Sequence, residues 1–316
     1  MNRSTLSILC VIGASVAFTL NDVSVKFVSG SYALHEVMLI RSGVALAITL
    51  TILVPLEGGL HVLRTRRPLL HVIRGLCIVI ANLAFLSAIT IIPLAELTAI
   101  FFLAPLMTTA FSVIFLGETV GMRRWLALLV GIIGVLLIVR PGGVEFQWAM
   151  MLPIIAATAY ATLNTITRKM GLSENASAMT LYIQLTFAAV CLMMGAAFGD
   201  GRYSGSGNPA LEFILREWRP IMIMDLLVIA GSGVCSAAGG YMISQAYRSS
   251  EAGLVAPFEY SALPLAVMWG FIIWGEVPSP VSAVGILVIL GSGVFIAIRE
   301  AQDRKTPITR RISGRR

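Results

Sequence analysis

A few polar residues interrupt otherwise apolar stretches of this chain, and two groups of them recur at a fixed distance. Asn21 and Lys26 in the first half correspond to Asn164 and Lys169 in the second half, each 143 residues later. Amides and charges are costly inside a lipid bilayer and are kept there where they pair or line a water-filled space. The matched groups therefore predict a duplicated unit whose polar spots meet in one cavity.

Amide and tyrosine side chains in an apolar cavity can hold a small zwitterion while aromatic rings stack on it. Two other roles stay open, because each amide could bond between helices and each tyrosine could anchor at the lipid interface. The residues predicted to bind substrate are Asn21, Asn82, Asn164, Tyr160, Tyr241, Gln245, Tyr260, Phe18, Phe85 and Phe101.

Three charged residues at membrane depth are candidates for coupling or gating: Glu259, Asp22 and Arg41. Burial disfavours the charged form of a carboxylate, so Glu259 could carry a proton. Asp22 lies four residues before Lys26, on one helix face, which predicts an ion pair between them. Arg41 also needs a partner, and Asp22 or Glu36 is the expected one.

No enzyme motif is found in the sequence. There is no glycine-rich phosphate loop and no zinc-binding helix motif. His35, His61 and His71 fall at predicted span ends or in loops, without carboxylate partners at ligand spacing. The four cysteines lie far apart in apolar stretches, as small buried hydrophobic residues do. We therefore expect no catalytic residue, no metal site and no cofactor.

The composition indicates an all-α integral membrane protein, because only 12% of the 316 residues are charged and 57% are hydrophobic. An average soluble domain is about 25% charged. Pro105, Pro153, Pro257 and Pro264 should interrupt their helices, and the polar segment 199–220 should lie in water. Runs of about 20 apolar residues, each able to cross a bilayer as a helix, predict ten transmembrane helices at about 5–27, 35–56, 69–91, 94–116, 123–139, 148–168, 177–198, 221–246, 252–274 and 279–298.

The repeat divides the chain into two five-helix domains, 1–145 and 146–316, the second with a basic tail. An odd number of spans per copy makes the second copy inverted in the membrane. Glu118 and Glu276 each follow a glycine, 158 residues apart, and are expected to fix helix ends. Seventeen of the 23 lysines and arginines fall on one predicted side, which places both termini in the cytoplasm.

The pattern resembles the drug/metabolite transporter superfamily in its EamA-like ten-helix branch. The resemblance lies in the matched first helices and in two stretches, from Pro105 to Gly117-Glu118 and from Pro257-Phe258-Glu259-Tyr260 to Gly275-Glu276. It implies a central cavity between two halves that rock to give alternating access. The branch includes exporters of aromatic and neutral amino acids, which the second stretch resembles. It also includes riboflavin and S-adenosylmethionine importers, which the Asp22-x-x-x-Lys26 element resembles.

From these features we expect a multi-pass transporter of the bacterial inner membrane that exports small amphipathic metabolites, foremost aromatic or neutral amino acids. An importer of riboflavin or S-adenosylmethionine-like metabolites is the alternative, and a non-transporting membrane receptor is the alternative from another class. The expected partners are a small-molecule substrate, the lipid bilayer and protons, with no nucleic acid. Because one chain holds both halves, we expect a monomer.

Overall fold

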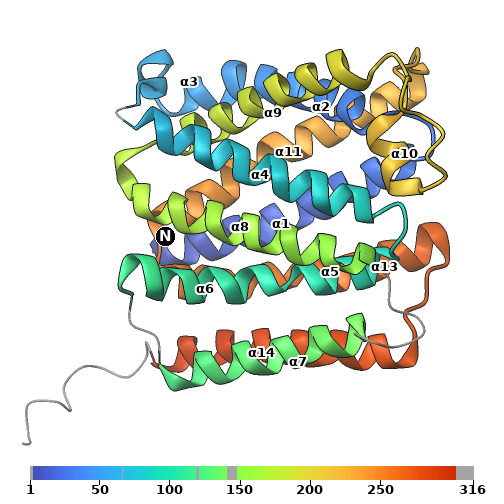
Figure 1. Ribbon diagram of the computed structural model, residues 1–316. Coiled ribbons are helices and arrows are strands. Elements are labelled where there is room, and N and C mark those ends of the chain that lie inside the picture. Colours follow the sequence, from blue (N-terminus) through green and yellow to red (C-terminus); the bar gives the residue numbers. More distant parts are fainter. Residues whose placement is uncertain (1–2, 66, 119–120, 141–147, 304–316) are drawn as a thin grey trace, which may run out of the picture.

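The computed structural model describes residues 3–65, 67–118, 121–140 and 148–303, and all regular secondary structure in these ranges is helical. The helices lie roughly alongside one another in a single bundle (Figure 1). The main elements are α1 (Arg3–Val28), α2 (Leu34–Ile48), η1 (Thr49–Leu53), α3 (Val54–Leu56), η2 (Leu60–Leu63), α4 (Pro68–Ala88), α5 (Leu94–Phe101), α6 (Leu103–Leu116), α7 (Met122–Val139), η3 (Trp148–Met150), α8 (Met151–Met170), η4 (Gly171–Ser173), α9 (Ala176–Phe198), α10 (Pro209–Leu215), α11 (Ile223–Ser249), α12 (Ala252–Val255), η5 (Ala256–Ser261), α13 (Ala262–Trp274) and α14 (Pro280–Asp303).

Seven helical stretches of the described chain are long and apolar enough to cross a membrane, and three further apolar helices are shorter. Their outer surfaces carry many exposed large apolar side chains, which suit lipid rather than water. This confirms the predicted all-α membrane class. The count of ten membrane crossings stays a prediction.

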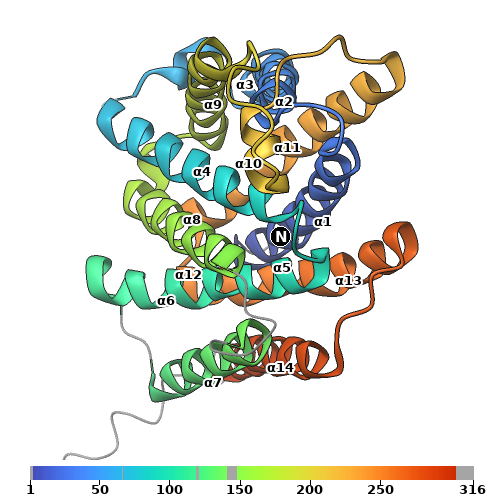
Figure 2. The same cartoon turned by 45° about the vertical axis from the view of Figure 1, so that its right-hand side comes forward.

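The helices contact one another in a reciprocal pattern. α1 packs along α11 and α4 packs along α8, while α2 lies on α9 and α5 lies on α13. α7 and α14 pair with each other at one edge of the bundle (Figures 1 and 2). Two copies of one unit related by a two-fold axis would give this pattern. The first helix of each copy packs on the third helix of the other copy, and the remaining helices pack on the equivalent helix of the other copy. The division near residue 145 itself stays a prediction.

The fourth helix of each predicted unit is broken. α5 ends at Phe101 and α6 begins at Leu103, so the break lies four residues before Pro105, which has no N–H for the Phe101 carbonyl. In the second unit the 3₁₀ segment η5 separates α12 from α13, and Pro264 follows it. Pro153 behaves differently, because it is the third residue of α8 and a first turn needs no such N–H. The predicted interruption there is wrong.

A left-handed glycine ends each broken helix, Gly117 with a φ of 68° and Gly275 with a φ of 65°. Glycine adopts this conformation without the cost that a Cβ imposes. The acidic residue that follows each glycine then reaches the end of a first helix. Glu118 Oε1 accepts a hydrogen bond from Arg168 Nε at 2.8 Å.

Glu276 makes the corresponding contact with Lys26 at the end of α1. Its second carboxylate oxygen accepts the backbone N–H of Leu94, 2.9 Å away, at the start of α5. Lys26 is therefore paired with a residue of α13's end, and the predicted Asp22–Lys26 ion pair is wrong. Both glutamates hold helix ends together, as expected from the sequence.

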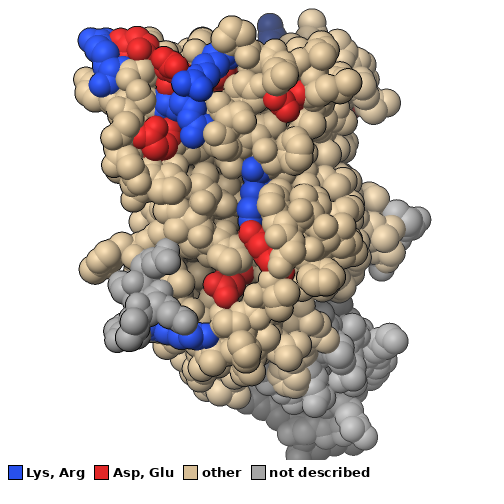
Figure 3. Space-filling model, turned by 90° about the vertical axis from the view of Figure 1, so that its right-hand side faces the viewer, with Lys and Arg blue, Asp and Glu red and all other residues tan. Residues whose placement is uncertain are grey.

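Residues 202–209 of the segment 199–220 are exposed, as expected for a segment in water, whereas its second part packs against the bundle. Asn208 caps the short helix α10, accepting the N–H of Ala210 at 3.0 Å, and Phe213 is fully buried. Trp218 Nε1 donates to Nδ1 of the buried His35 at 2.8 Å. Figure 3 looks onto the end of the bundle that carries α10, where charged side chains gather in a few places on a largely uncharged face.

Candidate substrate cavity

A cavity lies among α1, α2, α4, α5, α8, α9, α11 and η5. Its volume is about 150 Å³. That is smaller than the roughly 300–1,000 Å³ typical of pockets that bind drug-sized ligands.

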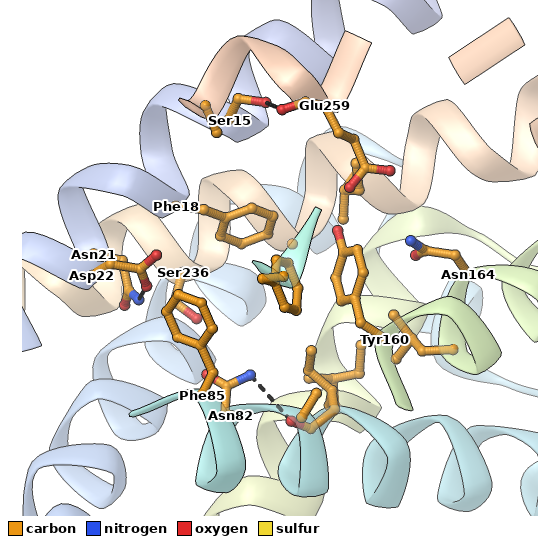
Figure 4. Close-up of a pocket in the computed structure, with 18 of the residues that line it drawn as sticks. Ser15, Phe18, Asn21, Asp22, Asn82, Phe85, Tyr160, Asn164, Ser236 and Glu259 are labelled. Carbon is orange, nitrogen blue, oxygen red and sulfur yellow. Dashed lines mark hydrogen bonds between the residues drawn. The ribbon is translucent and has the colours of Figure 1, made fainter. Parts of the chain in front are cut away.

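The helix breaks and the polar first helices bring most of the predicted site residues together here. Figure 4 shows Phe18, Phe85 and Tyr160 around the middle of the cavity, with Asn21 and Asn164 on opposite sides. The predicted residues that line the cavity are Phe18, Asn21, Asp22, Arg41, Asn82, Phe85, Phe101, Tyr160, Asn164 and Glu259.

Three predicted binding residues, Tyr241, Gln245 and Tyr260, are not among the residues that line it. Tyr241 donates its hydroxyl to Glu57 at 3.2 Å, and Gln245 accepts from Arg248 Nε at 2.6 Å. Tyr260 is buried and donates to the backbone carbonyl at the α5–α6 break, 3.3 Å away. Each of the three therefore bonds within the protein instead of facing the cavity.

Arg41 is held by amides, and its side chain is only 3% exposed. Its Nη1 donates to Asn21 Oδ1 at 3.2 Å and to Asn82 Oδ1 at 3.4 Å, and its guanidinium lies 4.9 Å from the centre of the Phe187 ring. Asn21 in turn donates to Asp22 Oδ1 at 3.0 Å. The amide of Asn21 thus stands between the two charges.

The predicted ion pairs of Arg41 are wrong, because it forms none with Asp22 or with Glu36 in the described part of the chain. Glu36 instead accepts the backbone N–H of Arg219 at 3.4 Å, from the segment that follows α10. Amides replace the carboxylate that the sequence suggested, so the charge of Arg41 is solvated without being neutralised by direct contact.

Glu259 occupies the 3₁₀ segment η5 and is 7% exposed. Tyr247 donates its hydroxyl to the Glu259 carboxylate, and Ser15 Oγ lies 3.5 Å from the Glu259 backbone carbonyl. The hydroxyl of Tyr160 points toward Glu259 from the other side (Figure 4). The break in the helix therefore presents this acid to the cavity among hydroxyl groups.

Arg74 lines the cavity and was missed as a site residue, because its place near a span end suggested a topology signal. It has no exposed surface, and its Nε donates to Thr167 Oγ1 at 2.8 Å. The sequence did hold a signal for it. Arg74 stands four and eight residues before Ile78 and Asn82, so all three share one face of α4.

His71 is likewise buried, and its Nε2 lies 3.3 Å from Glu174 Oε2. Sequence spacing could not indicate this pair, because Glu174 lies 103 residues from His71. Across the described residues, no group of three or more His, Cys, Asp or Glu is arranged to hold a metal ion. His71 and Glu174 lie outside the cavity lining and join α4 to the start of α9.

Comparison with known proteins supports a single family. Residues 5–140 match the EamA-like transporter family. A riboflavin transporter of Vibrio cholerae is 28% identical over 94% of this chain and 94% of its own length. An S-adenosylmethionine uptake transporter of Rickettsia conorii is 26% identical over 92% of each chain. A pseudopaline exporter of Pseudomonas aeruginosa is 25% identical over 90% of this chain and 93% of its own.

A solved crystal structure with 17% identity superposes with a TM-score of 0.63 over 96% of this chain and 98% of that chain, which shows a shared fold. The relatives match along nearly the whole chain and are named as transporters. The family predicted from the sequence is thus confirmed, and these names indicate a carrier instead of an enzyme. Residues 5–140 match the EamA-like transporter family, and the protein is a membrane transporter.

Proposed function

We propose that this transporter moves a small amphipathic metabolite with a flat ring system through the cavity between its two halves. The supporting observation is a continuous aromatic wall. The ring centres of Phe85 and Phe101 are 5.1 Å apart, and those of Phe101 and Tyr160 are 5.3 Å apart. Such walls stack on planar rings, while polar groups at either side orient the ligand.

Riboflavin and S-adenosylmethionine, the substrates in the names of several relatives, are the first candidates for this chain, and uptake is the proposed direction. Export of aromatic or neutral amino acids is the second candidate. It is favoured by the presence of Arg41 and Glu259 in one cavity, because these could hold the carboxylate and the ammonium group of a zwitterion. Protons are a candidate coupling ion through Glu259 or Asp22.

Alternating access is the proposed mechanism, with two inverted repeats, 1–145 and 146–316, as the moving parts. Two ion pairs support it, one at each end of the bundle (Figure 1). Lys26–Glu276 and Arg168–Glu118 each join the end of a first helix to the end of a fourth helix of the other repeat. A rocking motion that opens one end would break one pair and keep the other.

In the proposed topology both termini lie in the cytoplasm of a bacterial cell and one chain is sufficient for transport. The basic tail that carries much of this charge signal, 304–316, lies outside the described residues. The distribution of lysine and arginine over the loops supports this orientation.

Counterflow in liposomes tests the proposal. Purified protein should accelerate exchange of labelled riboflavin or S-adenosylmethionine over protein-free liposomes. Exchange of phenylalanine or threonine without either of these would favour the second candidate. No acceleration for any of the four would contradict the proposed substrate range.

A further inference from the structure

We infer that the cavity binds an anionic group of the substrate, a carboxylate or a phosphate, through Arg41 and Arg74. The inference rests on the proposed function, because it names the chemical class of substrate for the same cavity. It goes further in that riboflavin, which carries no such group, becomes the poorer fit of the two first candidates.

Both arginines line the cavity and are buried, Arg41 with 3% of its surface exposed and Arg74 with none. Neither forms an ion pair with a carboxylate in the part of the chain that the structure describes. Removing a charge from water is expensive unless an opposite charge or several hydrogen bonds compensate for it. Two buried guanidinium groups without a carboxylate in contact therefore provide a place for an anion.

Each guanidinium keeps an N–H group that no protein atom accepts, Nε of Arg41 and Nη2 of Arg74. Their other contacts are neutral. Arg41 Nη1 bonds to two amide oxygens, and Arg74 bonds to the Thr167 hydroxyl and, at 3.3 Å, to the Met179 carbonyl. These contacts orient the two side chains and leave their positive charges available to a ligand.

Donors also exceed acceptors among the unpartnered polar atoms of the lining. Asn164 Nδ2 is a third N–H donor without a partner, besides those of the two arginines. Gln184 Oε1 is an acceptor without a partner, and the Thr98 hydroxyl can donate or accept. This balance, within the described residues, suits a ligand that presents oxygen atoms. Carboxylates and phosphates do so, and they bond to guanidinium in the strongest geometry available to a side chain.

The two acids of the cavity do not contact the arginines. Asp22 accepts from the Asn21 amide, which separates it from Arg41, and Glu259 accepts from Tyr247. They leave a place for a cationic group elsewhere on the same substrate. A zwitterionic molecule with an aromatic ring between its charges would match all three features of the cavity.

The predicted repeat pairs each arginine with an uncharged residue. At the offset of 143 residues Arg41 corresponds to Gln184, and at the offset of 158 residues Arg74 corresponds to Ser232. Gln184 and Ser232 are both buried and both hydrogen-bonded where they stand. The two copies thus differ in charge at the cavity, which is where a substrate would impose a difference between them.

Matched ligand pairs test the inference on the purified full-length protein. S-adenosylmethionine and its decarboxylated form differ in a carboxylate, and flavin mononucleotide and riboflavin differ in a phosphate. Dissociation constants come from ligand-dependent thermal unfolding. In at least one pair the anionic member should bind about ten-fold or more tightly, as expected for a hydrogen bond to a charged group. Arg41→Gln and Arg74→Gln should each remove most of that preference and change the neutral member little.

Arg219→Gln, on an exposed segment, is the matched control and should keep the preference. Equal binding within both pairs, no binding of any anionic member, or an undiminished preference in both cavity variants would overturn the inference. If a glutamine variant fails to fold, the affinities of the wild-type protein for the two members of each pair still test the inference. Arg41→Lys or Arg74→Lys, which keep the positive charge, should retain part of the preference for the anionic member. Riboflavin transport without any preference would overturn this inference and leave the proposed function standing. A clear preference for the anionic member, with no transport of any of the ligands, would support this inference and contradict the proposed function.

Discussion

Replacing Glu276 by glutamine should weaken the closure of one end of the cavity and leave the other end closed. Glu276 and Lys26 are 21% and 10% exposed at their side chains, between a surface pair and a buried one. Exposed ion pairs contribute about 0.2–1 kcal/mol, and breaking a buried pair costs about 3–5 kcal/mol. An intermediate cost of about 1–3 kcal/mol corresponds to a shift of about 5–150-fold in the open-to-closed ratio.

Glutamine keeps an oxygen for the Leu94 N–H, so the substitution chiefly removes the charge. The assay uses a chain whose four native cysteines are replaced by serine and whose cavity residue Ser236 is replaced by cysteine. A membrane-impermeant thiol reagent is applied to vesicles of either orientation. Glu276→Gln should speed labelling of residue 236 from the face where α1 and α13 end.

Glu118→Gln, which breaks the pair with Arg168, should speed labelling from the opposite face. Glu217→Gln serves as the control, because its pair with Arg219 is exposed, at 47% and 58%, and should change neither rate. The reasoning is refuted if Glu276→Gln and Glu118→Gln open the same face, or if Glu217→Gln speeds labelling as much as they do.

Three further substitutions, one of them with a matched control, have expected outcomes. Asn164→Leu should lower counterflow and leave the membrane yield unchanged, because Asn164 is 1% exposed and has a free N–H in the cavity. Reduced yield with normal counterflow would indicate that Asn164 serves helix packing and does not bind substrate. Trp218→Ala should cost about 1–3 kcal/mol in thermal unfolding, since the buried His35 loses its hydrogen-bond donor. Gly75→Ala should cost about 1–3 kcal/mol, because its Cβ would lie 2.2 Å from Thr186 Oγ1, whereas Gly43→Ala, with open space around it, should not destabilise the protein.

Much of the fold could be predicted because a bilayer constrains helices so strongly. A span needs about 20 apolar residues, so the predicted boundaries follow the observed helices to within a few residues in most cases. The matched asparagines, Asn21 and Asn164, could be predicted from the same constraint. A polar side chain is costly at membrane depth, so one that recurs at the equivalent position of both halves indicates a function. Both line the cavity.

Partners distant in sequence could not be predicted. Local spacing assigned Lys26 to Asp22, whereas its partner is 250 residues away at the end of α13. Nor could the pattern decide which face of α11 meets the cavity, and Tyr241 and Gln245 turn instead toward Glu57 and Arg248. Packing sets the rotation of a helix, and the polar residues of α11 are spread too evenly around it for the sequence to indicate that rotation.

The most direct test of the account is to block the cavity and measure transport. With the native cysteines replaced, Ser236→Cys in liposomes is modified with a bulky thiol reagent, and counterflow of riboflavin and S-adenosylmethionine is followed. Ser206→Cys, in the exposed part of the segment 199–220, is the control. If the cavity is the transport path, modification stops counterflow at residue 236 and spares it at residue 206. Undiminished counterflow through a protein fully modified at residue 236 would contradict it.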